Sequence, residues 1–204
     1  MRYIIIAITI TLILFAFNKK ETTIKPLTQQ DTILAFGDSL TYGYNAPATQ
    51  SYPAVLRKLI GLKIINAGIL GETSEDGLKR LPELLETYSF KLMILCFGGN
   101  DIMQGISMAT LKSNLKTMIQ MVKEKKIEVL LISVPNLGLF GLSPLELYEE
   151  VADEESVPLL SGMLADILSQ PSLKSDQIHP NALGYKLMGK KIYESLKENG
   201  LLKN

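Results

Sequence analysis

The sequence predicts an α/β domain, a parallel sheet with helices on both faces, and two observations carry that prediction. From Asp31 onward, short apolar runs alternate with longer amphipathic stretches. Several of these runs are apolar at successive positions, as strands buried on both faces are. The alternation of strands with helices is typical of a parallel sheet covered on both sides. The 204 residues are enough for one such domain with a sizeable core.

Five apolar runs are the expected strands, and the expected helices lie between them. The runs are TILAFG (32–37), LKIINAG (62–68), KLMILCFGG (91–99), EVLLISV (128–134) and VPLLS (157–161). In the stretch 111–126, the apolar residues that follow the 3.6-residue helical period are Leu111, Leu115, Met118, Ile119 and Val122. A second helical pattern, from Leu183 to about Asn199, places on one side Leu187, Met188, Ile192 and Leu196.

Residues 1–17 differ in kind from the rest of the chain. Met1 and Arg2 precede an uncharged apolar run from Tyr3 to Phe17, which resembles the h-region of a secretory signal. The run is shorter than the ~20 residues that span a bilayer comfortably. A cleaved signal peptide and a retained membrane anchor both remain open, whereas a buried element of the domain is disfavoured because the run has no polar face. Both open interpretations place the protein outside the cytoplasm, as a periplasmic, secreted or membrane-anchored domain.

The remaining boundaries follow from composition. Residues 18–30 are polar and rich in Thr, Lys and Gln, and they are expected to form a linker. Residues 31–204 are expected to form the working domain. Membrane association is expected only through the N-terminal apolar segment.

Charge and composition exclude several classes of function. Lys and Arg number 21 and Asp and Glu number 21, with no Trp and no basic stripe, so nucleic acid is not an expected partner. Cys96 is the only cysteine and His179 the only histidine, which excludes an internal disulfide and a cysteine or histidine metal cluster. Asp38 and Asp101 could be metal ligands, but each is better explained as a helix cap. We therefore expect neither a metal nor a cofactor, and we expect Cys96 to be buried packing.

Small and reactive residues follow the predicted strands, where a parallel sheet places its sites. Gly37-Asp38-Ser39 follows the first run, NAGILGETS with Gly68 and Gly71 closes the second, and Asn100 follows the third. Asp176 and His179 come after the fifth run and a short helix. Each motif alone is ordinary turn chemistry. Their order and their placement at one edge of the sheet favour a common site.

These residue types are the parts of an acyl-transfer site. A serine hydroxyl becomes a nucleophile when a base removes its proton, and imidazole does this near neutral pH. His179 would be the base for Ser39, and Asp176, three residues earlier, would orient the imidazole. The backbone N–H of Ser39, the N–H of Gly71 and the side-chain amide of Asn100 would bind the oxyanion. The G-x-S-x-G elbow of the usual α/β-hydrolases is absent from the sequence.

Taken together, these motifs resemble the SGNH hydrolases, also called GDSL lipases and esterases. The motifs are FGDSLTYGYN with Ser39, NAGILGETS with Gly71, GGND with Asn100, and SDQIHPN with Asp176 and His179. The resemblance runs from about Thr32 to Leu196 and is strongest to the bacterial thioesterase I, lysophospholipase and arylesterase branch. It implies a flavodoxin-like three-layer α/β/α sandwich with a five-stranded parallel sheet. It also implies hydrolysis of carboxylic esters or thioesters through an acyl-enzyme, without a cofactor, on a small acyl ester or a lysophospholipid.

One loop departs from that branch, which tends to have polar residues after the fourth strand. Here the loop reads VPNLGLFGLSPLELY, with four large apolar residues: Leu137, Leu139, Phe140 and Leu142. They either pack the loop onto the core or form an apolar wall for an acyl chain. Gly138 and Gly141 would allow the loop to move.

Two alternatives to this function stay open. One is a carbohydrate O-acetylesterase, an activity that the resembled family also includes. The other is a catalytically silent binding module on the same fold, which the intact set of Ser, Gly, Asn, Asp and His disfavours. The sequence leaves open the acyl chain length, the preference between ester and thioester, and the oligomeric state.

Overall fold

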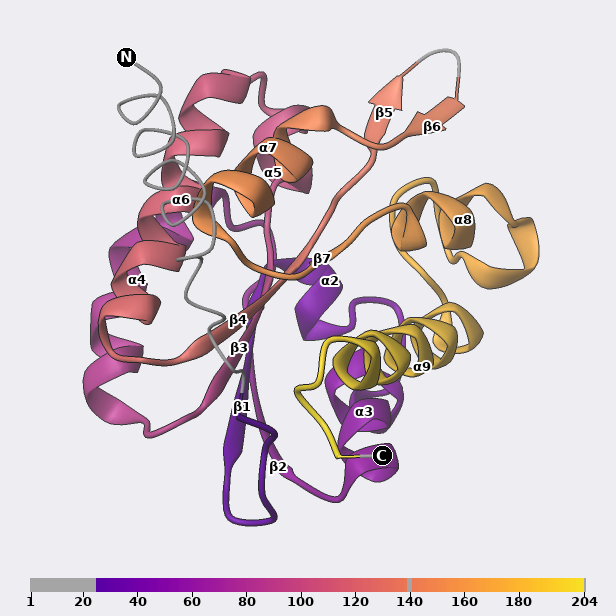
Figure 1. Ribbon diagram of the computed structural model, residues 1–204. Helices are drawn as coiled ribbons and strands as arrows, with labels where there is room; N and C mark the ends of the chain where they lie inside the picture. Colours follow the sequence, from indigo (N-terminus) through magenta and orange to yellow (C-terminus); the bar gives the residue numbers. More distant parts are fainter. Residues whose placement is uncertain (1–24, 139–140, 204) are drawn as a thin grey trace, which may run out of the picture.

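The protein is an α/β/α sandwich in the computed structural model, which describes residues 25–138 and 141–203 (Figure 1). Of residues 137, 138 and 141 only the backbone is described. The central sheet has the strand order β2-β1-β3-β4-β7, and every pair in it is parallel. This is the flavodoxin-like order. The predicted fold class is therefore confirmed.

The five predicted runs are the five strands of this sheet. Their bounds are β1 Thr32–Gly37, β2 Lys63–Gly68, β3 Leu92–Cys96, β4 Glu128–Ile132 and β7 Leu159–Leu160. All five residues of β3 are buried, which explains why its sequence is apolar without alternation. The edge strand β2 is only partly buried.

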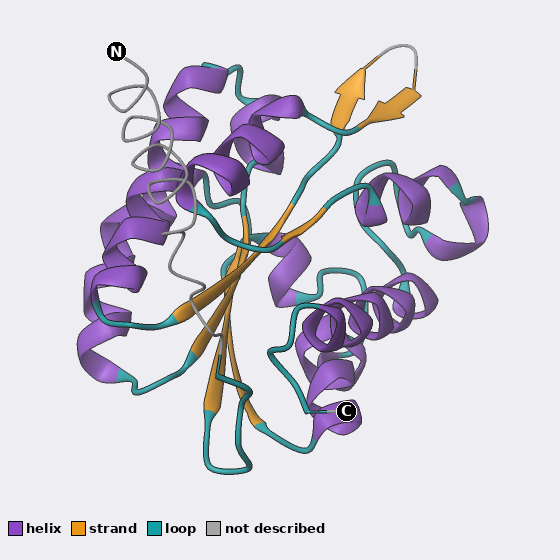
Figure 2. Ribbon diagram, viewed as in Figure 1, coloured by secondary structure: helices purple, strands orange, loops and turns teal. Residues whose placement is uncertain are grey.

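Two layers of helices cover the sheet. Figure 2 shows one group on either side of the strands. One layer contains α4 (Ser74–Thr87), α6 (Met108–Glu124) and α7 (Glu146–Glu155). The other contains α3 (Tyr52–Ile60), α8 (Met163–Ser169) and α9 (Ala182–Glu198). The two helices predicted from periodicity are α6 and α9, and their predicted faces point into the core, Leu187 being half-buried.

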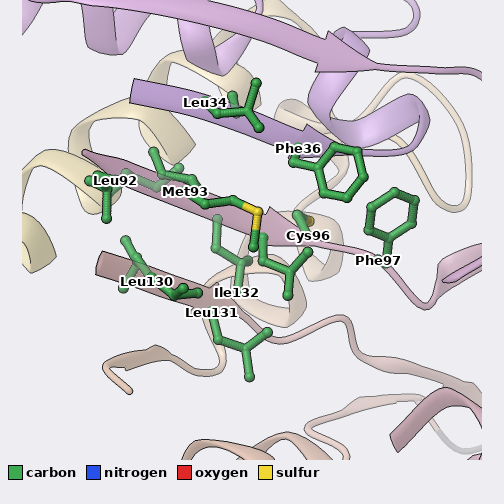
Figure 3. Packing of buried hydrophobic residues seen from close by; sticks show 14 of the residues in the cluster. Leu34, Phe36, Leu92, Met93, Cys96, Phe97, Leu130, Leu131 and Ile132 are labelled. Carbon is green, nitrogen blue, oxygen red and sulfur yellow. The ribbon is translucent and has the colours of Figure 1, made fainter. Parts of the chain in front are cut away.

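The core lies between the sheet and these layers. Figure 3 shows side chains of β1, β3 and β4 packed together, among them Leu34, Met93 and Leu131. The Phe36 and Phe97 rings meet edge to face, with their centroids 5.0 Å apart. Cys96 is buried in this packing, as expected.

The N-terminal segments are only partly within the described residues. Residues 1–17, and the predicted linker up to residue 24, lie outside them. Residues 25–30, which the sequence analysis places in the linker, contact the domain. Leu27 is buried and its N–H donates to the carbonyl of Leu201 over 2.9 Å. Among the helices of residues 25–138 and 141–203, none is long and apolar enough to cross a membrane.

The loop after β4 contains a second, two-stranded sheet that the sequence analysis did not predict. Strands β5 (Asn136–Gly138) and β6 (Gly141–Ser143) pair antiparallel, with Gly138 opposite Gly141. The hairpin projects from the end of the sandwich beside α8 in Figure 1. Leu139 and Phe140 lie outside the described residues.

Candidate active site

Ser39 lies at the point where the central strand β1 gives way to a helix. Asp38 is the N-cap of the one-turn helix α2 (Ser39–Tyr42), and its Oδ1 accepts from the Leu40 N–H over 2.9 Å. This is the capping role expected for Asp38. The turn places Ser39 at the first helical position, with its hydroxyl at the carboxyl edge of the sheet.

His179 reaches Ser39 from the other end of the sequence. The Nε2 atom of His179 lies 2.9 Å from Ser39 Oγ. The imidazole is nearly buried, and its backbone is fixed because the His179 carbonyl accepts from the Ser175 N–H over 2.9 Å. Asn181 then caps α9 by accepting from the N–H groups of Leu183 and Gly184. The imidazole therefore sits in a short loop anchored at both ends.

Asp176 completes the series of three side chains. Its carboxylate oxygens lie 3.0 and 2.9 Å from His179 Nδ1, so Nδ1 carries a proton for the carboxylate and Nε2 is free to accept from Ser39. Its Oδ1 also accepts from the backbone N–H groups of Ile178 and His179, at 2.9 and 2.8 Å. Burial raises the pKa of Asp176, but the Ile178 N–H and the His179 ring and N–H outweigh it, so the pKa lies below the usual value.

Asn100 lies beside these three groups. It belongs to the short helix α5 (Gly99–Met103), and it lines one pocket together with Ser39 and His179. Its Nδ2 donates to the Glu72 carbonyl over 2.8 Å, which fixes the plane of the amide. A second, longer bond from the same nitrogen reaches Asp38 Oδ2 over 3.4 Å, so a ligand in the pocket would compete with Asp38 for the other amide hydrogen.

The two glycines of NAGILGETS differ in role. A side chain on Gly68 would collide with the backbone of Tyr42, so Gly68 is required for the close approach of β2 to α2. Gly71 has a left-handed φ of +77°, and a Cβ there would meet no atom within 4 Å. Gly71 is outside the residues that line the pocket, and it adjoins the site through Glu72, whose carbonyl Asn100 contacts.

The side chain of Glu72 is part of an ion pair that the sequence analysis missed. Arg80 of α4 donates from Nε to both Glu72 oxygens at 2.8 Å, and from a second nitrogen at 2.6 Å. The same guanidinium donates to the carbonyls of Ala67 and Gly37, at the ends of β2 and β1. No short-range pattern indicates this pair, since its partners meet across the turn between β2 and α4.

Asp101 was expected to cap the helix that follows it, and that expectation was wrong. Its carboxylate is buried and accepts from the N–H and the hydroxyl of Ser74, at 2.9 and 2.5 Å. The reason is that Asp101 lies within α5 and its side chain faces the start of α4. Asp38 is also buried. Burial raises its pKa to about 7, and the charges of Asp101 and Glu72 act in the same direction.

The apolar wall of the pocket comes from residues that the sequence analysis did not select. Besides the polar groups and Gly99, its lining consists of Leu40, Met103, Val134, Pro135, Leu168 and Ile178. Of the predicted wall, Leu139 and Phe140 lie outside the described residues and Leu137 is described only by its backbone. Leu142 is half-buried and is not among the lining residues. In SDQIHPN, the apolar residue Ile178 lies between Asp176 and His179, and this is the one sequence feature that could have indicated the apolar wall.

Hydrogen bonds connect a serine hydroxyl to an imidazole and the imidazole to a carboxylate, at the carboxyl edge of a flavodoxin-like sheet. This arrangement defines an enzyme of the serine hydrolase class. Residues 35–187 match the GDSL-like Lipase/Acylhydrolase family. The chain belongs to that family.

Relatives and solved structures agree with this membership. The chain is 34% identical over 158 residues to "Thioesterase 1/protease 1/lysophospholipase L1" of Escherichia coli (strain K12), covering 74% of this chain and 76% of the relative. It is 31% identical over 184 residues to "Esterase TesA" of Pseudomonas aeruginosa, covering 84% and 92%. The crystal structure of the psychrotrophic esterase EstA from Pseudoalteromonas sp. matches with a TM-score of 0.74 at 25% identity, covering 83% of this chain and 98% of that one.

Proposed function

We propose that the protein hydrolyses carboxylic esters or thioesters through an acyl-enzyme formed on Ser39. The observation that carries the proposal is the continuous series of hydrogen bonds from Ser39 Oγ to His179 and from His179 to Asp176, at 2.9 Å for each link. In the first half-reaction the Ser39 proton passes to His179 Nε2 while Oγ bonds to the acyl carbon. His179 then protonates the leaving alcohol or thiol. In the second half-reaction water bonds to the acyl carbon and loses a proton to His179, which returns that proton to Ser39 Oγ as the ester bond breaks and the acid leaves.

The oxyanion of each tetrahedral intermediate would be bound by the Ser39 N–H, the Gly71 N–H and the Asn100 side-chain amide. Two features support these roles. Within the described part of the chain, neither the Ser39 nor the Gly71 N–H is used in a hydrogen bond. The Asn100 amide is held beside Ser39 by the Glu72 carbonyl, and the oxyanion would replace its long, 3.4 Å bond to Asp38 Oδ2. Removal of one such donor typically costs roughly 3–4 kcal/mol of transition-state stabilisation.

The substrate class follows from the pocket lining. Met103, Leu168 and Ile178 give the pocket an apolar wall beside Ser39, which suits the acyl part of a small ester or a lysophospholipid. The printed names of the relatives, thioesterase, lysophospholipase and esterase, support the same class. This wall is also why we favour acyl esters over the carbohydrate O-acetylesterase alternative.

The test is hydrolysis of p-nitrophenyl esters by the purified protein and its Ser39→Ala variant. We expect the variant to lose activity while its unfolding midpoint stays near that of the wild type. Activity retained by Ser39→Ala would refute the proposal. A series of acyl chain lengths then separates the alternatives, because a strict preference for acetyl would favour the O-acetylesterase and count against the apolar wall.

We further propose that the enzyme works outside the cytoplasm, delivered by the apolar segment 1–17 as a cleaved signal or a retained anchor. The support is the apolar run itself. Expression of the full chain, followed by fractionation and mass measurement, tests this. A periplasmic or secreted product shortened at its N-terminus indicates cleavage, and a full-length product in the membrane fraction indicates an anchor. A full-length product in the cytoplasmic fraction would contradict both.

A further inference from the structure

Two consecutive residues after α2 contact the acid and the base of the site. The Tyr44 ring lies against the His179 ring, with 4.8 Å between centroids and the planes tilted by 59°. The Asn45 Nδ2 donates to Asp176 Oδ2 over 2.9 Å and to Ser175 Oγ over 3.2 Å. The loop that follows Ser39 therefore reaches the other two members of the series directly.

The Asn45 contact falls on the less restrained oxygen of the Asp176 carboxylate. Oδ1 is held by the backbone N–H groups of its own turn, from Ile178 and His179. Oδ2 receives only the His179 ring and the Asn45 amide within the described residues. The Asp176 side chain is 39% exposed, so water competes for that oxygen. A donor at 2.9 Å from the far side restricts the rotation of the carboxylate.

The backbone of Asn45 allows the role of its side chain to be isolated. Asn45 has a φ of +62°, in the left-handed region where glycine, asparagine and aspartate are tolerated. Glycine would satisfy this backbone without an amide. Aspartate would satisfy it with a side chain of the same shape that accepts instead of donating. Neither replacement strains the loop.

We propose that Asn45 is a positioning residue of the active site, whose side-chain amide holds the Asp176 carboxylate in the orientation that accepts from the His179 ring. The inference rests on the proposed roles of Ser39, Asp176 and His179. The amide also offsets part of the negative charge on the carboxylate.

Other titratable groups face His179 and Asp176, and they are the same in every variant of residue 45. Tyr44 lies against the imidazole with its ring tilted, Asp38 lines the same pocket, and the buried Tyr185 of α9 is close enough for the charge of Asp176 to act on it. Burial raises the pKa of Tyr185 further above its usual range, and the charge of Asp38 adds to this. Asp38 itself titrates near neutral pH, because burial raises its pKa to about 7. A difference in the pH profile between the variants is therefore caused by the change at residue 45.

The experiment compares kcat and KM for a p-nitrophenyl ester, from about pH 5 to about pH 9, in the wild type, Asn45→Gly, Asn45→Asp and Lys126→Gly. Lys126 is the matched control. It is exposed and also left-handed, with a φ of +59°, and it precedes β4, at the edge of the sheet opposite to the site. Lys126→Gly makes the same backbone change as Asn45→Gly without touching Asp176.

We expect Asn45→Gly to lower kcat roughly tenfold or more with KM unchanged, because Asn45 is not among the residues that line the pocket. Its unfolding midpoint should not fall. We expect Asn45→Asp to move the acid limb of the profile up by about one pH unit, because a second carboxylate favours the protonated imidazole. Lys126→Gly should match the wild type.

Wild-type kcat in Asn45→Gly would overturn the inference. A second result would also overturn it: a lower kcat in both Asn45 variants, with the acid limb of the Asn45→Asp profile at the wild-type pH. That result would indicate that Asn45 has only a structural role. If Ser39→Ala is inactive while the Asn45 variants behave as wild type, this inference fails and the proposed function stands. Activity in Ser39→Ala would instead remove the proposed function.

Discussion

Replacing Arg80 by methionine tests how the loop that carries Gly71 is held. Methionine keeps an apolar contact on the Phe36 ring, over which the guanidinium lies at 4.4 Å from the centroid. It removes the cation from Glu72, and it removes the donors to the carbonyls of Ala67 and Gly37. The side chains of Arg80 and Glu72 are only 18% and 13% exposed, so water replaces these bonds poorly.

The cost follows from what the substitution leaves behind. Breaking a buried ion pair by removing one partner costs about 3–5 kcal/mol, because the remaining charge is uncompensated. In Glu72→Gln/Arg80→Met no lone carboxylate remains, and we expect the cost to fall to about 1–2 kcal/mol for the unpaired carbonyls. The double variant should therefore be more stable than Arg80→Met alone. Both variants should also lose rate, because the loop beside Asn100 is no longer clamped to β1 and β2.

Urea unfolding of the wild type, both variants and Lys79→Met provides the measurement. Lys79 is the matched control, since it forms an exposed pair with Glu75 on the same helix and its loss should leave the midpoint nearly unchanged. The reasoning is refuted if Arg80→Met costs no more than Lys79→Met. It is also refuted if the double variant is less stable than Arg80→Met, because the pair would then not be coupled.

Three further predictions concern the carboxylates and the base. Asp176→Asn should keep the turn, because the amide oxygen still accepts from the backbone N–H groups. It should lower kcat by about 10⁴-fold, because the amide favours the wrong imidazole tautomer. A loss of kcat below tenfold would contradict the role of Asp176. The rate should fall on acidification as His179 takes up a proton, and a flat kcat/KM profile between about pH 5 and pH 8 would contradict its role as base. Burial raises the pKa of Asp38 to about 7, so the folded state retains a proton that the unfolded chain loses from about pH 4 upward. The free energy of unfolding should therefore fall by about 3 kcal/mol between pH 5 and pH 8 relative to Asp38→Asn, and equal slopes for the two proteins would contradict this.

The fold and the hydrogen-bonded arrangement of Ser39, His179 and Asp176 could be predicted because both depend on local patterns. A strand buried on both faces reads as an apolar run, and β3 is apolar at every position. A parallel sheet brings its carboxyl ends to one edge, so residues that follow strands meet there. The spacing of Asp176 and His179 fits one turn, and that turn is what the Asp176 carboxylate stabilises.

What the sequence did not indicate depends on side chains that meet across elements. Asp101 contacts Ser74, which lies 27 positions away, and Asn45 contacts Asp176, which lies 131 positions away. A helix cap is predicted from residues next to the helix in sequence, so the contact of Asp101 with the start of α4 could not be predicted in this way. The sequence does not indicate the hairpin β5–β6, because its strands have only three residues each, too few for a recognisable alternation.

Covalent labelling by a fluorophosphonate probe tests the central claim most directly, because the probe bonds to a serine only when a base and an oxyanion site activate that serine. Peptide mapping by mass spectrometry, applied to the wild type, Ser39→Ala and His179→Ala, locates the adduct. We predict a single adduct on Ser39 in the wild type, none in Ser39→Ala, and strongly slowed labelling in His179→Ala. An adduct on another serine, or no adduct in the folded wild type, would contradict the account.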